Sequence, residues 1–207
     1  MRVARILYPV TVLGPGKRIA IWVAGCSKRC QGCANPELWD GSVYPKVEMS
    51  QLEMAIEAIY EKASGDVDGI TISGGEPFEQ AEELVQLVSF LEKRTDDILV
   101  FSGKKKEELL QNSIMAEVLE KIAVLVDGEY IEAENEGEVL RGSRNQEIHI
   151  QKTEMKMKYE GYLEQNKGKH LAETFHVKDG VIVVGIHKKD FDSELEKALE
   201  KKAIAHR

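Results

Sequence analysis

Short runs of apolar residues alternate along the chain with segments whose apolar residues recur at helical spacing. The apolar runs predict buried strands at residues 19–24, 69–73, 98–101 and 122–126. The amphipathic segments predict helices at residues 50–63, at 79–93, around Leu109 and Leu110, and at 115–121. Such alternation is typical of βα units around a parallel sheet. Four units are too few for a complete eight-stranded barrel, so we expect an α/β fold with a partial, open βα barrel.

Weaker patterns describe the remainder of the chain. Periodicity fades between residues 129 and 170, where Glu and Lys dominate, and we expect a long loop there. Residues 173–185 predict a hairpin whose Asp179-Gly180 pair favours a tight turn, and residues 190–202 predict an amphipathic helix. The expected organisation is a core and a C-terminal extension of linker, hairpin and helix packed on it, at residues 1–150 and 151–207.

One helix boundary has a local signal of its own. Ser50 is the first residue of the helical segment predicted at residues 50–63, and Glu53 follows three residues later, which is the spacing of a capping box. We therefore expect Ser50 to be the N-cap of that helix.

Composition narrows the classes of partner that the protein could bind and the cellular compartments that suit it. The 207 residues carry a net charge of −8, so no strong basic field would attract nucleic acid. The densest basic run, residues 104–106, is expected to be a solvated helix start. The first residues lack a long apolar region and a small-residue cleavage site, and no apolar stretch approaches about 18 residues, so we expect neither a signal peptide nor a membrane span. An odd number of closely spaced cysteines suits a reducing cytoplasm better than a disulfide framework.

The three cysteines of the chain lie together in a C-x3-C-x2-C pattern, at Cys26, Cys30 and Cys33. Three thiolates on one short loop can bind three irons of a cubane cluster, with Gly25 and Gly32 allowing the loop to curve. A cluster that only carries electrons usually has four cysteine ligands. The spacing therefore suggests an open iron at which chemistry takes place.

A structural zinc site is the main alternative for these cysteines, and three inert buried thiols are a further one. Structural zinc usually has four protein ligands, and His149 is the nearest histidine in sequence. None of the five histidines has ligand spacing, so we expect surface or packing roles for His149, His170, His176, His187 and His206. The cysteine spacing alone leaves the zinc alternative open.

A second motif, Gly74-Gly75-Glu76-Pro77, follows directly after a predicted strand. The glycines allow close approach of a ligand, and Pro77 forces Glu76 out of the helical region. Ligands of α/β folds collect at such carboxyl ends of strands. An ordinary strand-to-helix turn is the alternative interpretation.

The two motifs in this order resemble those of the radical S-adenosylmethionine superfamily. The resemblance implies that Cys26, Cys30 and Cys33 hold a 4Fe–4S cluster and take part in catalysis. It also implies that the open iron binds S-adenosylmethionine, and that the edge at residues 74–77 contacts the amino group of this cofactor. Reductive cleavage would then yield a 5′-deoxyadenosyl radical, with the protein supplying ligands and orientation.

Further motifs make the chain similar to the anaerobic ribonucleotide reductase activating proteins over about residues 1–150, which would then be the radical core. They are the Cys-Gln-Gly-Cys-Ala-Asn run with Trp39, Phe-Ser-Gly103, Val-Leu-Val-Asp-Gly128 and Leu-Arg-Gly-Ser-Arg-Asn-Gln146. The resemblance implies hydrogen abstraction from a glycine of a large partner enzyme, with a reduced flavodoxin- or ferredoxin-type electron donor. A radical enzyme acting on a peptide or small molecule, and a non-catalytic zinc-binding module, are the alternatives.

The resemblance also suggests roles for residues outside the two main motifs. Ser102 and Asp127 end predicted strands and could contact the cofactor or close turns, while Ala34 stands where the family often has an aromatic residue near the adenine. Arg141 and Asn145 belong to a segment that either shapes the nucleoside pocket or anchors a loop.

Overall fold

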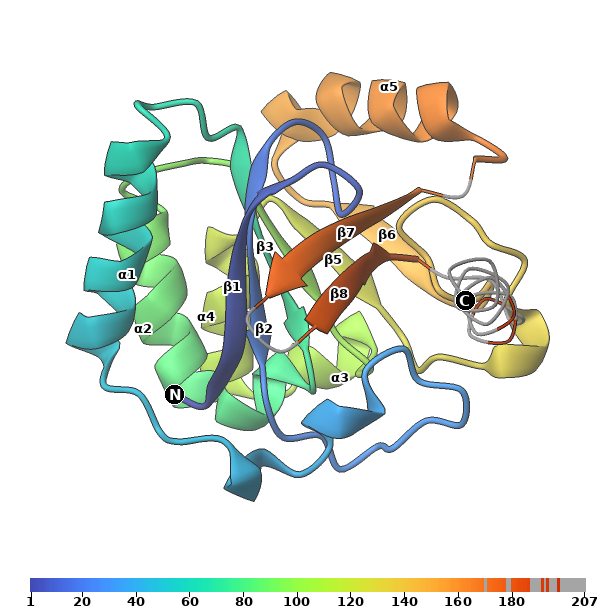
Figure 1. Cartoon of the computed structure of the whole chain (residues 1–207), viewed down its shortest axis with the longest axis horizontal. Coiled ribbons are helices and arrows are strands. Elements are labelled where there is room, and N and C mark those ends of the chain that lie inside the picture. Colours follow the sequence, from blue (N-terminus) through green and yellow to red (C-terminus); the bar gives the residue numbers. More distant parts are fainter. Residues whose placement is uncertain (170, 178–179, 187–190, 192, 194–196, 198–207) are drawn as a thin grey trace, which may run out of the picture.

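A mixed six-stranded sheet forms the centre of the computed structural model, which describes residues 1–169, 171–177, 180–186, 191, 193 and 197 (Figure 1). In spatial order its strands are β1 (Val3–Val10), β2 (Arg18–Val23), β3 (Gly69–Gly74), β4 (Ile98–Phe101), β5 (Val124–Asp127) and β6 (Glu147–Ile150). Strands β2 to β5 are parallel, and β1 and β6 are antiparallel edges. The predicted α/β class is confirmed, while the curvature of a partial barrel stays a prediction.

Helices cover one face of this sheet (Figure 1). They are α1 (Met49–Lys62), α2 (Ala81–Leu91) and α4 (Ser113–Lys121), with the short α3 (Lys106–Leu109) beside them. Alternate residues of β2 point to opposite faces, so Ile19, Ile21 and Val23 join the core beneath the helices. Short 3₁₀ helices occupy connections at Pro36–Leu38, Gly41–Val43, Pro77–Gln80, Glu132–Glu134 and Thr153–Met155.

The opposite face is covered by two segments from the last part of the chain. The hairpin of β7 (Ala172–Val177) and β8 (Gly180–Gly185) crosses in front of the strands and packs on Ala20 and Trp22 of β2 (Figure 1). Helix α5 (Lys156–Asn166) packs on the side chains of β4 and β5 through Tyr159. The predicted hairpin at residues 173–185 is therefore confirmed.

The register of the parallel strands brings the two sequence motifs together. Strand β2 pairs with β3 from Arg18↔Gly69 to Val23↔Gly74, so both strands end at the same level. Strands β4 and β5 end beside them, with Phe101 opposite Val126. The cysteine loop and the Gly-Gly-Glu turn therefore start from neighbouring carboxyl ends of one sheet.

Two local expectations were wrong, and one strand was missed. Residues 129–170 are not one long loop, because they contain β6 and α5. The apolar period of α5 is weak, since its residues are mainly polar and Tyr159 is the one buried residue on it. Strand β1 was not anticipated, since most of its residues are partly exposed. Helix α1 begins at Met49, with Glu48 as its N-cap in place of Ser50. The side chain of Gln51 accepts a hydrogen bond from Glu48 N at 3.4 Å.

Some predictions concern residues outside the described ranges. These are the body of the helix expected at 190–202, the turn at residue 179, and His170, His187 and His206. Among the helices that the structure describes, none combines the length and the apolar character needed to cross a membrane.

Candidate active site

The cysteine loop leaves the end of β2 and is held in a tight curve by main-chain hydrogen bonds. Gly25 N donates to Leu38 O at 2.7 Å. Cys26 N donates to Trp39 O at 3.1 Å. Gly25 and Gly32 have φ angles of 106° and 71°, which favour glycine. The expected contribution of these two glycines to the curve of the loop is confirmed.

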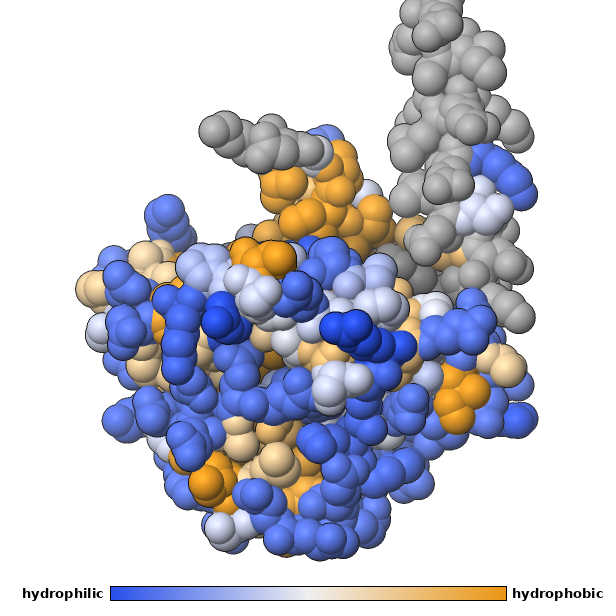
Figure 2. All heavy atoms as spheres, turned by 90° about the horizontal axis from the view of Figure 1, so that it is seen from below, coloured by the Kyte–Doolittle hydropathy of each residue, from blue (hydrophilic) through white to orange (hydrophobic). Residues whose placement is uncertain are grey.

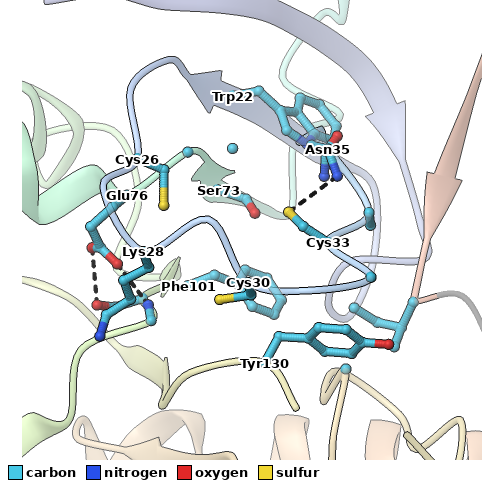
Figure 3. A pocket seen from close by; sticks show the side chains of 18 of the residues that line it. Trp22, Cys26, Lys28, Cys30, Cys33, Asn35, Ser73, Glu76, Phe101 and Tyr130 are labelled. Atoms are coloured by element: carbon cyan, nitrogen blue, oxygen red, sulfur yellow. Dashed lines mark hydrogen bonds between the residues drawn. The ribbon is translucent and has the colours of Figure 1, made fainter. Parts of the chain in front are cut away.

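All three cysteine side chains line one cavity of about 270 Å³. Figure 3 shows the sulfur atoms of Cys26, Cys30 and Cys33 around the same space, and all three thiols are free. Burial raises the pKa of the Cys26 and Cys30 thiols above the usual 9.0, although backbone N–H groups act in the opposite direction. A metal must therefore displace protons from these sulfurs, because the thiolate is the ligand.

The three thiols around one cavity meet a requirement of a cubane cluster. A tetrahedral zinc ion would hold thiolates about 4 Å apart, since Zn–S bonds are about 2.3 Å long. Within the described part of the chain, no three His, Cys, Asp or Glu side chains gather closely enough to hold one metal ion. A cubane binds each thiolate at a different iron, and three thiols around one cavity fit that requirement.

The Gly-Gly-Glu turn is locked against the start of the cysteine loop. Gly75 N donates to Val23 O, and Glu76 N donates to Gly25 O, each at 2.8 Å. A Cβ on Gly74 would strike the Val23 backbone, and one on Gly75 would strike the Gly25 carbonyl. The two glycines thus allow β3 to end directly against β2 and the loop, and both also line the cavity.

Glu76 lines the cavity with a carboxylate that is satisfied by neutral donors. Phe78 N and the Ser102 hydroxyl each donate to Oε1 at 3.0 Å, and Gly103 N donates to Oε2 at 2.7 Å. Burial raises the pKa of Glu76 above 4.5, and these donors only partly offset it. The backbone of Glu76 is extended, as expected before Pro77.

The other predicted cofactor residues divide into two groups. Ala34 and Ser102 line the cavity, whereas Pro77 and Asp127 do not. Pro77 is buried at the start of a 3₁₀ turn. The Asp127 carboxylate accepts from Lys106 N at 2.6 Å and lies 3.3 Å from His149 Nε2, while the neighbouring Gly128 reaches the cavity.

The Arg-Gly-Ser-Arg-Asn-Gln segment anchors the loop that follows β5. Arg141 donates to Gln146 O at 3.2 Å, and Asn145 Nδ2 donates to Glu129 O at 2.8 Å. The Gln146 side chain donates to Gly128 O at 2.7 Å and lines the cavity. The segment was expected either to shape the nucleoside pocket or to anchor a loop, and the hydrogen bonds of Arg141 and Asn145 anchor a loop.

Sequence reasoning missed several residues of the cavity wall. They include Arg5, Trp22, Asn35, Phe101, Tyr130 and residues 183–186 of the hairpin (Figure 3). Trp22 and Phe101 lie near the carboxyl ends of buried strands, a position that could have marked them. Arg5 and the hairpin come from distant parts of the chain, and nothing local in the sequence points to the cavity.

Comparison with known proteins agrees with this chemistry. A family model described as a 4Fe-4S single cluster domain matches residues 12–149. Relatives include the anaerobic ribonucleoside-triphosphate reductase-activating proteins of Escherichia coli (strain K12), Vibrio cholerae serotype O1 and Enterobacteria phage T4. They are 32% identical over 151 residues, 34% over 149 and 31% over 150, respectively. The alignments cover 69% of this chain and 94%, 94% and 90% of those proteins.

The family model covers the cysteine loop, the Gly-Gly-Glu turn and most of the sheet. A single-cluster iron–sulfur domain accounts for the three thiols around one cavity. The chain is therefore an iron–sulfur protein that belongs to the family of anaerobic ribonucleoside-triphosphate reductase-activating proteins, glycyl-radical enzyme activases of the radical S-adenosylmethionine type.

Proposed function

We propose that this chain activates an anaerobic ribonucleoside-triphosphate reductase by abstracting a hydrogen atom from one of its glycines, with S-adenosylmethionine as the radical source. The observation that carries the proposal is the set of three thiols around one cavity, beside the Gly-Gly-Glu turn. The relatives are named as activating proteins of such a reductase, which supports the same class of partner here.

Cys26, Cys30 and Cys33 would hold three irons of a 4Fe–4S cluster and leave the fourth iron for S-adenosylmethionine. When bound, the cluster and S-adenosylmethionine supply a one-electron cleavage that yields a 5′-deoxyadenosyl radical. The protein supplies three thiolates, a fixed orientation and a confined space.

The Gly-Gly-Glu turn would hold the amino end of the cofactor with its backbone. Gly74 and Gly75 border the cavity, and their positions are fixed by hydrogen bonds to β2 and the cysteine loop. We assign a positioning role to Glu76 and Ser102, because their side chains bond to each other and to the backbone. Pro77 would fix the exit of this turn.

Two further residues would act near the nucleoside. Ala34 follows Cys33 on the cavity wall and would lie beside the adenine. Asp127 would act through the corner that it fixes, because its neighbour Gly128 borders the cavity.

Apolar side chains would keep water away from the radical. Leu13, Trp22 and Phe101 line the cavity, and Leu13 and Trp22 are 5% and 4% exposed. A site that excludes water prevents side reactions of such an intermediate.

We further propose that residues 1–150 form a radical core whose sheet works as an open βα barrel, with residues 151–207 as an extension packed on it. The open side would admit a folded loop of the reductase. A reduced flavodoxin- or ferredoxin-type protein would supply the electron, and the cytoplasm would provide the reducing surroundings.

The experiment is anaerobic reconstitution with iron and sulfide, followed by reduction in the presence of S-adenosylmethionine and the cognate reductase. We expect about four irons per chain, production of 5′-deoxyadenosine, and a glycine-centred EPR doublet on the reductase. Cys30→Ala should lose the cluster and both products. Ser27→Ala, an exposed position of the same loop, should retain all of them.

Other outcomes would contradict the proposal in distinct ways. Cleavage of S-adenosylmethionine without a glycyl radical would favour a radical enzyme that acts on another peptide or on a small molecule. One zinc per chain without 5′-deoxyadenosine would favour a structural metal-binding module.

A further inference from the structure

Strand β8 borders the cavity through its edge. Residues 183–186 all line the cavity. Successive side chains of a strand point to opposite faces, so the neighbouring Val183 and Val184 share one cavity when the edge of β8 is turned toward it. Among the residues that the structure describes, β8 pairs with β7 alone. Half of its backbone N–H and C=O groups therefore point away from β7, toward the cavity side.

This edge lacks the features that usually protect exposed edge strands. Natural edges carry charges, prolines, bulges or very few residues. The outer strand β1 has Arg5, Pro9 and two breaks in its register. The outer strand β6 has four residues, with Glu147 and His149 among them. In contrast, β8 reads Gly-Val-Ile-Val-Val-Gly, without charge or proline.

The hairpin is firmly attached, so its edge is held in place. Val184 is 4% exposed and packs among apolar side chains of β1 and β2. The Glu173 carboxylate accepts a hydrogen bond from Thr11 N at 3.0 Å. Hydrophobic side chains gather on the part of the molecule that projects at the top of Figure 2, and Val177 and Val181 of the hairpin are 41% and 54% exposed.

The hairpin also lies outside the region that the family model matches. The family model ends at residue 149. The alignments cover at least 90% of the three relatives but 69% of this chain. The apolar strand edge beside the cavity thus comes from a part of the chain beyond the matched 4Fe-4S domain.

We propose that an extended segment of the reductase, containing the target glycine, binds as an added strand on the edge of β8 that faces away from β7. This inference rests on the proposed function and concerns how the substrate is presented. Main-chain hydrogen bonds to β8 provide affinity that depends little on sequence. A glycine at the point where the added strand passes the cavity exposes its Cα hydrogens, because no side chain stands between them and the cavity.

Hydrogen exchange tests the proposal without turnover of S-adenosylmethionine. The anaerobic, cluster-loaded protein is mixed with overlapping peptides that together cover the reductase chain. We expect at least one peptide to bind and to slow exchange of the amides of residues 181–185, with smaller changes in β7. Binding that leaves β8 unchanged would overturn the inference. Equal protection of β8 before any peptide is added would also overturn it, because this chain or a second copy would already cover the edge.

A pair of facing residues provides a matched test by mutation. Thr174 and Val183 are opposite each other in the hairpin, so proline at either position disturbs their pairing to the same extent. Only Val183 borders the cavity. Val183→Pro should weaken peptide binding about tenfold more than Thr174→Pro, because it places the proline ring at the binding edge. Equal effects would contradict the inference.

The results distinguish this inference from the proposed function. If the reductase acquires a glycyl radical while β8 stays unprotected, the activase function stands and strand addition is wrong. If no reductase peptide binds and no glycyl radical forms, both are wrong.

Discussion

Glu76 and Asp97 are both buried carboxylates, but they lie at opposite ends of the parallel strands and have opposite surroundings. Glu76 follows β3 at the carboxyl end, where its partners are two backbone N–H groups and the Ser102 hydroxyl. Asp97 precedes β4 at the amino end, where its partners include two cationic side chains. The two residues are 1% and 2% exposed, so burial alone does not distinguish them.

The amino-end cluster joins segments that are far apart in the sequence. Arg18 is fully buried, and its Nη2 lies 3.0 Å from Asp97 Oδ1. The Tyr159 hydroxyl donates to the same oxygen at 2.6 Å, and Lys158 Nζ lies 2.7 Å from Oδ2. Arg18 Nε also donates to Thr71 Oγ1 at 2.7 Å. The cluster therefore connects β2, β3 and β4 with helix α5.

The pKa values of the two carboxylates are shifted in opposite directions. Burial acts to raise the pKa of both groups. At Asp97 the Arg18 charge and the bonds from Lys158 and Tyr159 outweigh burial, and the pKa falls below 3.8. At Glu76 burial prevails, and the pKa rises above 4.5. The comparison indicates that the amino end is built for stability, while the carboxyl end keeps a poorly compensated carboxylate beside a cavity.

The largest effect should follow from removal of the amino-end carboxylate. Asp97→Ala leaves Arg18 buried without its counter-charge, and loss of a partner from a buried pair costs about 3–5 kcal/mol. Urea unfolding of the apoprotein measures this loss. Asp96→Ala is the matched control, because Asp96 is 73% exposed and its ion pair with Lys152 is at the surface. A loss as small as that of the control would contradict the stabilising role of the cluster.

A smaller effect should follow from removal of one hydroxyl on α5. Tyr159→Phe deletes the hydrogen bond to Asp97 and keeps the ring in place, so we expect a loss of about 1–2 kcal/mol. Tyr162→Phe on the same helix should cost less, since Tyr162 is only partly buried and its hydroxyl reaches Thr11 O at 3.4 Å. Equal unfolding midpoints for the two variants would show that α5 does not depend on the buried cluster.

The smallest effect should appear in the pH dependence of stability. The contribution of Glu76 is complete below about pH 4.5 and is lost as pH rises through its raised pKa. The contribution of Asp97 is complete above pH 3.8 and is lost as pH falls through its lowered pKa. Glu76→Gln should therefore reduce the loss of folding stability above pH 4.5 and leave the loss of stability in acid unchanged. Urea unfolding midpoints measured over a pH series test both expectations. They would be refuted if the variant still lost stability above pH 4.5, or if its loss of stability in acid differed from that of the unchanged protein.

The centre of the fold was predictable because its strands are buried on both faces. Residues 98–101 form a continuous apolar run, and the run has the same bounds as β4. The edge strands gave no such signal, since β1 and β6 are partly exposed. Helix α5 was missed because its attachment depends on Tyr159 and on partners more than fifty positions away.

The candidate site was predictable where its residues are close in sequence. Cys26, Cys30 and Cys33 lie on one loop, and Glu76 lies in one turn. The wall formed by β8 and the Arg18–Asp97 pair depend on tertiary contacts, so no local pattern could reveal them. Arg18 was a particular difficulty, because an arginine at the start of an apolar run gives no sign of being fully buried.

The main-chain bonds from Gly75 to Val23 and from Glu76 to Gly25 have a consequence for protein engineering. A cysteine loop transplanted into another scaffold would lose its support unless the strand with the Gly-Gly-Glu turn were transplanted beside it. The smallest portable unit of this site is thus a pair of parallel strands with both of their outgoing turns.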